Sequence, residues 1–364
     1  MSVLSIPSPA AAEIKGRLRP TDADGAPPTT ELLPRIDVVV AFWNESKLIA
    51  PKVRNLLALD YPPELLRFIF VDGGSTDESM LVAKLSAKGD KRFAWLSCPG
   101  RGKTAQLNMA MDHATAPWLL VTDADARLPT ETLRSMIGAA DRSEKIGLVG
   151  VRCYPRHAIG ADRAHWSLWN TIRKVENVFG CATALGPCYL IRRAAFGGWP
   201  KSVIADDVFA SLEINRTGAR AILSDVLVIE RRAPSGLLAL VWHKLRKARA
   251  VVREFLRFLP RSLEFGWKSC PIFLFRAIAL LLGPFAILTM IGWLAITFPF
   301  ATLAGAGAFI VLAGPAGRRA QVVQKAARAP LLMVMLSIVL VVAIATCAFV
   351  RSKPEFCRWK QEEM

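Results

Sequence analysis

The sequence lacks the cysteine and histidine patterns that hold structural metals. Its 364 residues include seven cysteines without a CxxC pair or zinc-ligand spacing. The four histidines form no HExxH motif and no pair spaced i, i+4. These absences exclude a recognisable zinc module, and the odd cysteine count argues against a complete disulfide framework. We therefore expect the soluble part to lie in a reducing, cytosolic environment.

A signal peptide is also absent from the first residues. Residues 1–34 contain no continuous apolar core and are rich in Pro, Ala, Thr and Asp. We expect these residues to form a disordered leader.

Charge is missing from two long stretches near the C-terminus. Ala277–Gly314 and Pro330–Val350 contain no charged residue, and ~20 apolar residues suffice to cross a bilayer as a helix. We expect two or three transmembrane helices within residues 270–351. The first stretch, with Pro299 near its middle, fits either a tight helical hairpin or one tilted span followed by an interfacial segment.

The topology follows from the basic residues around these stretches. A positive loop prefers the cytoplasm, which predicts a multi-pass protein of the cell membrane with its soluble domain on the cytoplasmic side. The tail, residues 352–364, also carries basic residues, at Lys353, Arg358 and Lys360, and Arg351 directly precedes it, which argues against three spans. The basic residues between the two stretches are Arg318, Arg319, Lys325 and Arg328.

Basic residues outnumber acidic ones by 47 to 30, giving a net charge of +17. They concentrate near the apolar segments and not in a stripe interleaved with aromatic residues, so nucleic acid is not the expected partner. Within residues 231–269, the apolar side chains Leu245, Val252 and Phe255 share one side of a basic helix. This pattern predicts an amphipathic helix in the layer of anionic lipid headgroups.

The part of the chain over residues 35–230 alternates strand and helix patterns. Strands are predicted at Arg35–Phe42, Leu66–Val71, Phe93–Ser97 and Trp118–Thr122 from their β-branched and aromatic residues, with amphipathic helical segments between them. The predicted fold class is α/β, with a doubly wound, mostly parallel sheet followed by the C-terminal transmembrane helices.

Polar residues follow three of these strands, at Asn44, Asp72 and Asp123. Open α/β sheets bind ligands at the carboxyl edge of their strands. Asp123 and Asp125 are two residues apart, so they point the same way and suit one hard cation together with a nucleotide diphosphate. A single Asp-x-Asp is more often a polar turn, but three successive polar strand ends favour a nucleotide site.

These motifs, in this order, resemble the inverting family 2 glycosyltransferases with the GT-A fold. The resemblance covers roughly Ile36–Arg257 and implies transfer of a sugar from a nucleotide donor. The segments that carry it are Ala41–Glu45, Asp72–Asp77, Arg101–Asn108, Asp123–Asp125, Gly186–Arg193 and Ala205–Asp207.

The resemblance also implies roles for individual residues. Asp207, next to Asp206, is implied as the catalytic base, and Asp123 and Asp125 as ligands of Mg²⁺ or Mn²⁺. Read without the resemblance, Asp206 and Asp207 equally fit an acidic pair at a helix N-terminus. The residues implied for binding the nucleotide sugar are Asn44, Glu45, Asp72, Lys103 and Asp123.

One motif of the polymer-forming relatives is altered. Their Gln-x-x-Arg-Trp segment reads His243-Lys244-Leu245-Arg246-Lys247 here, so only Arg246, a candidate for contacting the diphosphate, is retained. We therefore expect single transfer from a UDP-linked sugar to a lipid or membrane-associated glycan, a step of cell-envelope glycan biosynthesis. The alternatives are a processive polysaccharide synthase and a non-catalytic, membrane-anchored subunit that binds a nucleotide sugar.

Overall fold

The computed structural model describes residues 33–100, 102–155, 170–183, 186–230, 237–298 and 337–347. Several predicted features lie outside these residues: nearly all of the leader, Arg101, the second half of the first uncharged stretch, the basic loop after it and the C-terminal tail. Two of the four histidines, His157 and His165, also lie outside them.

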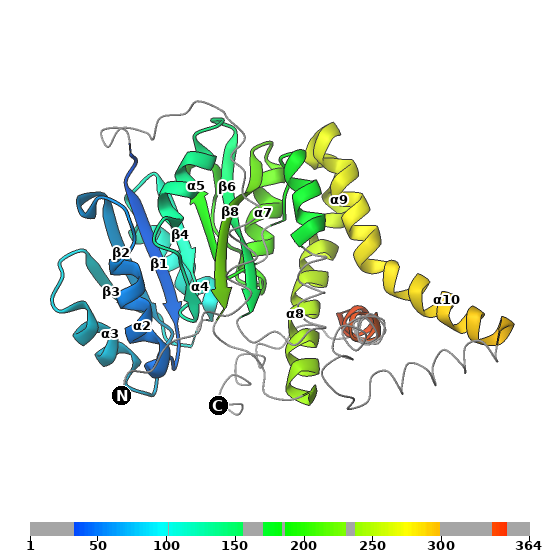
Figure 1. The fold of residues 1–364 in the computed structure, drawn as a ribbon, viewed down its shortest axis with the longest axis horizontal. Coiled ribbons are helices and arrows are strands. Elements are labelled where there is room, and N and C mark those ends of the chain that lie inside the picture. The colour runs from blue at the N-terminus through cyan, green and yellow to red at the C-terminus, as the bar shows by residue number, and fades with distance from the viewer. Residues whose placement is uncertain are drawn as a thin grey trace, which may run out of the picture. The chain divides into compact units, whose positions relative to one another are not determined.

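The described strands form one sheet in the order β3-β2-β1-β4-β7-β6-β8-β5 (Figure 1). The strands are β1 Ile36–Phe42, β2 Leu66–Asp72, β3 Phe93–Ser97, β4 Trp118–Thr122, β5 Ala126–Arg127, β6 Ile146–Pro155, β7 Cys188–Arg192 and β8 Arg220–Glu230. The four strands expected from the sequence form one half of this sheet as neighbours.

Most of the sheet is parallel, as expected. β1 pairs in parallel with β2 and β4, β2 with β3, and β6 with β8. β7 runs antiparallel to both of its neighbours, β4 and β6, and β5 runs antiparallel to β8. The fold is a mixed α/β sheet in which β7 separates two parallel blocks and β5 lies antiparallel at one edge.

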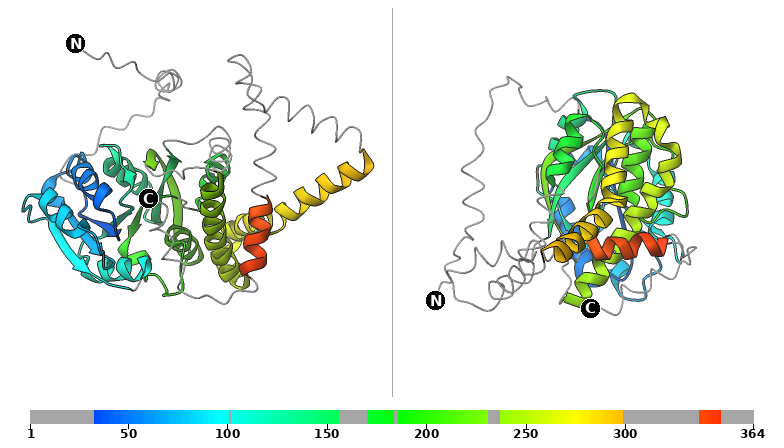
Figure 2. Two further views of the ribbon diagram at one scale, coloured as in Figure 1. Left: turned by 90° about the horizontal axis from the view of Figure 1, so that it is seen from below. Right: turned by 90° about the vertical axis from the view of Figure 1, so that its right-hand side faces the viewer.

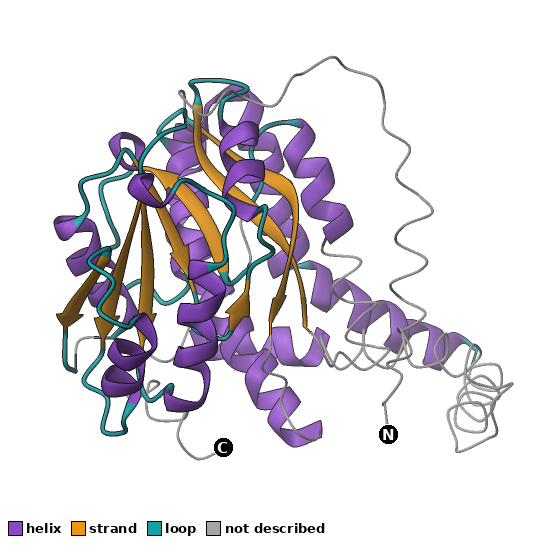
Figure 3. Cartoon of the chain, turned by 60° about the vertical axis from the view of Figure 1, so that its left-hand side comes forward, coloured by secondary structure: helices purple, strands orange, loops and turns teal. Residues whose placement is uncertain are grey.

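Helices cover both faces of the sheet (Figure 3). β1 is buried along almost its whole length, as expected for a strand covered on both sides. Helix α4 packs on β1 and β2, and α5 and α7 pack on β6 and β8. The helices of this part are α2 Ser46–Leu57, α3 Ser79–Ala87, α4 Lys103–His113, α5 Thr132–Ala140 and α7 Asp206–Arg216, with 3₁₀ turns η2 Pro63–Leu65 and η3 Arg193–Ala195.

Helix α8, Leu237–Phe258, is the basic amphipathic helix predicted from the sequence. Its residues Val252 and Phe255 are fully buried and belong to the same core as Phe209 of α7. The expectation that these apolar residues face lipid is therefore wrong, because α7 and the following helices cover them. Phe255 stacks on Phe273 with 5.7 Å between ring centroids.

The chain continues through η4 Leu259–Phe265, α9 Gly266–Leu281 and α10 Gly283–Thr297. Among the described residues, no single helix has both the length and the apolar composition to cross a membrane. Only Val241–Leu281 and Gly283–Leu294, taken together as a pair bent by 45°, meet these criteria.

A short apolar helix, Ser337–Cys347, lies beside α8 (Figure 2). Val339 and Ala343 pack against Leu245. Arg249 of α8 donates a hydrogen bond from Nε to Thr346 Oγ1 at 2.8 Å. This part of the second uncharged stretch therefore contacts the protein on one side.

Candidate active site

The parallel strands β1, β2 and β4 bring their carboxyl ends to one edge of the sheet. Asn44 and Asp72 are joined there through the loop after β2. The backbone N–H of Asn44 donates to Ser75 Oγ at 2.9 Å, and Asp72 accepts from Ser75 N at 3.0 Å and from Ser75 Oγ at 2.6 Å. Asn44 Oδ1 accepts from Thr76 N at 2.8 Å. Two predicted nucleotide-binding residues thus form one hydrogen-bonded rim.

Asn44 adopts a left-handed backbone conformation, with φ of 51°. Asparagine tolerates this region better than most residues, which fits its place directly after a strand. The N-cap of α2 is Glu45, whose side chain makes no capping hydrogen bond. Glu45 is only 6% exposed, so it lies beneath the rim.

Asp123 and Asp125 lie in the turn between β4 and β5. The N–H of Asp123 donates to Pro187 O at 2.8 Å, and the N–H of Ala126 donates to Asp123 O at 3.3 Å. Asp125 is partly exposed. The turn therefore offers two neighbouring carboxylates at the carboxyl edge, as the sequence predicted.

Lys103, the first residue of α4, joins two parts of this edge. Its Nζ lies 2.8 Å from Asp123 Oδ1 and 2.8 Å from Asp206 Oδ1. Burial by itself lowers the pKa of Lys103, but the two carboxylates outweigh it and the net pKa is raised. The Lys103 ammonium thus holds the Asp123 turn and the start of α7 together.

Asp206 and Asp207 begin α7 but differ in their partners. Asp206 accepts a hydrogen bond from the buried Tyr189 hydroxyl at 2.6 Å, in addition to its ion pair with Lys103. Asp207 accepts from the N–H groups of Gly186 and Val208, each at 2.8 Å. Burial, followed by the Asp206 charge, raises the pKa of Asp207 to about 7.

Arg246 does not join this group of side chains. It lies partly buried on α8, and among the described residues no carboxylate lies within 4.0 Å of its guanidinium. The contact of Arg246 with a diphosphate stays a prediction.

Asn108 fixes the loop that leads into Asp206. Its side chain donates to Trp199 O at 2.6 Å and accepts from Trp199 N at 2.9 Å. The Trp199 indole in turn donates to the carbonyl of Asp206 at 3.0 Å. An open hollow of about 450 Å³ lies beside the Asn108–Trp199 hydrogen bonds, between the second half of α4 and residues 197–200.

Sequence reasoning missed two buried residues at this edge, Tyr189 and Lys52. Lys52 is 2% exposed and donates to Thr122 Oγ1 at 2.7 Å and to Ala126 O at 3.0 Å. Burial lowers its pKa to about 8. The sequence does contain an indication that Lys52 is unusual. Lys52 falls on the same helical face as Ile49, Val53 and Leu56, where an apolar residue is expected.

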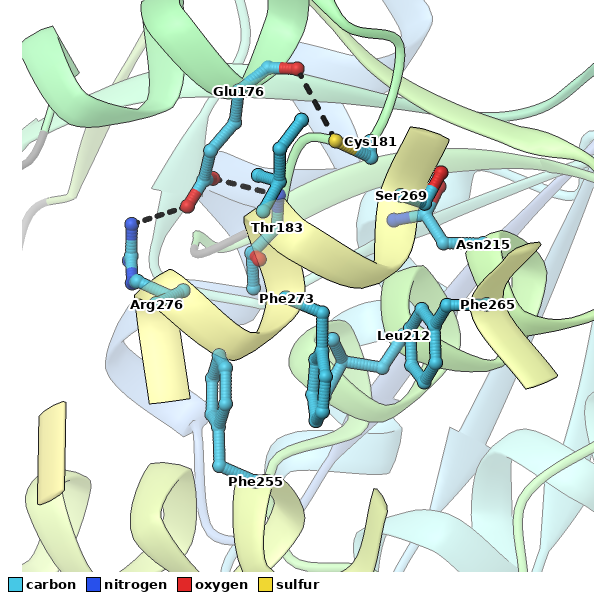
Figure 4. A pocket seen from close by; sticks show the side chains of 11 residues that line it. Glu176, Cys181, Thr183, Leu212, Asn215, Phe255, Phe265, Ser269, Phe273 and Arg276 are labelled. Atoms are coloured by element: carbon cyan, nitrogen blue, oxygen red, sulfur yellow. Dashed lines mark hydrogen bonds and ion pairs between the residues drawn. The ribbon is translucent and has the colours of Figure 1, made fainter. Parts of the chain in front are cut away.

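A second cavity lies away from this edge, among α7, α8, α9 and residues 176–183 (Figure 4). It holds about 10 Å³, room for roughly one water molecule. Beside it, Arg276 Nη1 and Glu176 Oε1 form a buried ion pair at 2.5 Å. The Glu176 carboxylate also accepts from the N–H of Thr183 at 3.1 Å. Its size excludes a nucleotide, so this cavity is structural.

Comparison with known proteins agrees with this arrangement. Residues 37–198 match the model of glycosyl transferase family 2. Cellulose synthase 1 of Komagataeibacter xylinus is 23% identical over 265 residues, which cover 67% of this chain and 17% of that protein. The β-monoglucosyldiacylglycerol synthase of Nostoc sp. is 27% identical over 191 residues, covering 48% of this chain and 40% of that protein. The chain thus spans well under two thirds of either relative.

Among solved structures, a mannosyltransferase from Pyrobaculum calidifontis in complex with GDP-mannose and Mn²⁺ has a similar fold. The TM-score is 0.68 and the identity 23%, with 94% of each chain covered. At this identity the likeness concerns the fold.

Proposed function

We propose that this chain, whose residues 37–198 match the model of glycosyl transferase family 2, transfers a single sugar, with inversion, from a UDP-linked donor to a lipid or membrane-associated glycan. The observation that carries the proposal is the ion-paired link from Asp123 through Lys103 to Asp206. This link brings the predicted donor side next to Asp207. A site that only bound a nucleotide would have no need of a base there.

In an inverting transfer, the acceptor hydroxyl attacks the anomeric carbon from the face opposite the leaving diphosphate. Asp207 takes the hydroxyl proton in this proposal. A general base works best when its pKa lies near the operating pH, and the pKa of Asp207 is about 7. Backbone N–H groups hold both of its oxygens in place.

The donor set at the Asp123–Asp125 turn fits Mg²⁺ or Mn²⁺, which prefer oxygen ligands. Among the described residues, no group of three or more His, Cys, Asp and Glu side chains could hold a metal alone. Asp123 and Asp125 would therefore share the ion with the diphosphate and water. When bound, the ion supplies neutralisation of the charge that develops on the leaving diphosphate. Mn²⁺ in the similar mannosyltransferase structure supports this choice.

A membrane acceptor accords with the C-terminal helices and with one relative. The name of the Nostoc enzyme describes a glycolipid product, and the bent pair formed by α8–α9 and α10 meets the length and composition of a span. We place the chain at the cell membrane with the sheet on the cytoplasmic side, where nucleotide sugars are available.

Calorimetric titration of the detergent-purified full chain with UDP, GDP and ADP, with and without Mn²⁺, tests the proposal. We expect UDP to bind more tightly with Mn²⁺, and Asp125→Ala to remove this gain. Asp225→Ala serves as the matched control, because the Asp225 side chain is 98% exposed. Folded protein that binds none of the nucleotides would contradict the proposal.

A processive polysaccharide synthase is the second candidate, favoured by the similarity to cellulose synthase 1. Mass spectrometry of the products made by purified protein from UDP-glucose or UDP-N-acetylglucosamine separates the two. Single transfer gives products extended by one sugar, and a synthase gives a ladder. Nucleotide binding without any product, in membranes that supply acceptors, would instead indicate a non-catalytic subunit.

A further inference from the structure

Lys52 is a buried ammonium group directly beneath the Asp123–Asp125 turn. It comes from α2, far from the turn in sequence, and only 2% of it is exposed. Its Nζ donates to the hydroxyl of Thr122, the residue before Asp123, at 2.7 Å. It also donates to the carbonyl of Ala126, the residue after Asp125, at 3.0 Å. One side chain thus holds both ends of the turn.

Two further hydrogen bonds of the turn involve other partners. Asp123 N donates to Pro187 O, and Ala126 N closes the turn on Asp123 O. Asn55 of α2 also binds the chain just after the turn, through two hydrogen bonds with the backbone of Leu128 at 2.7 and 2.8 Å. Lys52 differs from Asn55 because it reaches both ends of the turn itself, at Thr122 and Ala126.

A buried charge is unfavourable unless nearby groups stabilise it. Among the described residues, no carboxylate lies within 4.0 Å of Lys52. The carboxylates of Asp123 and Asp125 nevertheless favour its charged form through longer-range attraction.

We infer that Lys52 is a positioning residue for the metal-binding turn, which holds Asp123 and Asp125 in the arrangement that receives a divalent cation together with a nucleotide diphosphate. The inference rests on the proposed function. Contact geometry supports the inference, because two hydrogen bonds from one buried group hold both ends of the turn.

The test compares wild type with Lys52→Met in the full chain, using UDP as the probe. Its affinity is measured by calorimetry in EDTA and in saturating Mn²⁺, and the ratio is the gain due to metal. We expect this gain to fall about tenfold in Lys52→Met, the size of one lost charge-assisted contact, while UDP affinity in EDTA stays unchanged. Lys47→Met, at an exposed position of the same helix, should retain the full gain.

A purely structural role would leave the metal gain unchanged, whatever happens to the melting temperature, and that result overturns the inference. If Lys52→Met does not fold, Thr122→Val removes one of the two contacts and should reduce the gain about threefold; an undiminished gain there also overturns it. Failure of the proposed function looks different, because wild-type protein would then show no gain from Mn²⁺ at all.

Discussion

At the scale of single residues, Asp206 and Asp207 are adjacent but suited to different tasks. Asp206 forms an ion pair with Lys103 and accepts a hydrogen bond from the Tyr189 hydroxyl, so both of its carboxylate oxygens interact with other side chains of the protein. Among the described residues, the Asp207 carboxylate accepts from two backbone N–H groups, and its pKa is raised to about 7, first by burial and then by Asp206. The protonation of Asp207 therefore changes near neutral pH.

This difference predicts the pH dependence of transfer. Asp207 must lose its proton before it can accept one, so kcat/KM should fall as pH drops below about 7 and level off above it. Asp207→Asn should lower kcat by about 100-fold or more. The activity that remains in this variant should no longer fall as the pH drops below about 7. Pre-steady-state or initial-rate profiles of both proteins check this. If kcat/KM of Asp207→Asn still falls at low pH as in the wild type, a group other than Asp207 causes the pH dependence.

The residue scale also shows what one sequence can reveal. Asp207, Asp123 and Asp125 are predicted site residues because each lies in a segment that resembles a family motif, and these segments follow one another in the family's order. Lys52 and Tyr189 were not, because their importance arises from burial against strands that are distant in sequence. Only the three-dimensional arrangement places an ammonium group from α2 under a turn that follows β4.

At the scale of elements, the first four strands and their parallel pairing were predictable, and the later strands were not. β1 to β4 follow from their β-branched and aromatic runs and from the helical segments between them. β5 to β8 were not predicted, and the antiparallel direction of β7 cannot be read from its own residues. Helix α3 begins at Ser79, after a loop in which Asn44 and Asp72 accept hydrogen bonds from the N–H groups of Thr76 and Ser75.

The buried ion pair between Glu176 and Arg276 connects residues 170–183 to α9. Both side chains are 5% exposed. Removing one partner leaves the other charge buried, so Glu176→Gln should destabilise the protein by about 3 kcal/mol or more. The double variant Glu176→Gln, Arg276→Met should recover part of that loss, because it removes both partners of this ion pair. Thermal unfolding in detergent measures both, and equal losses in the two variants would contradict this account.

At the scale of the whole molecule, the exposed apolar residues gather at the C-terminal end of the described chain. On α10, Met290, Trp293 and Ile296 are 55%, 60% and 83% exposed. A soluble protein rarely leaves several large apolar side chains of one helix in water. Together with the basic residues of α8, this distribution accounts for the excess of positive charge better than a nucleic-acid partner does.

The exposed apolar residues of α10 lead to a prediction about how the chain binds a membrane. If α10 enters the bilayer, wild-type protein should stay in the membrane pellet at high salt and leave it only with detergent. Charges at the exposed positions, in Trp293→Glu with Ile296→Glu, should release the protein in salt, because a carboxylate at bilayer depth is costly. Leu85→Glu, at a 69% exposed position of α3, is the matched control and should remain in the pellet. Release of wild type by salt alone would instead mean that the basic helix α8 holds the protein at the surface by charge.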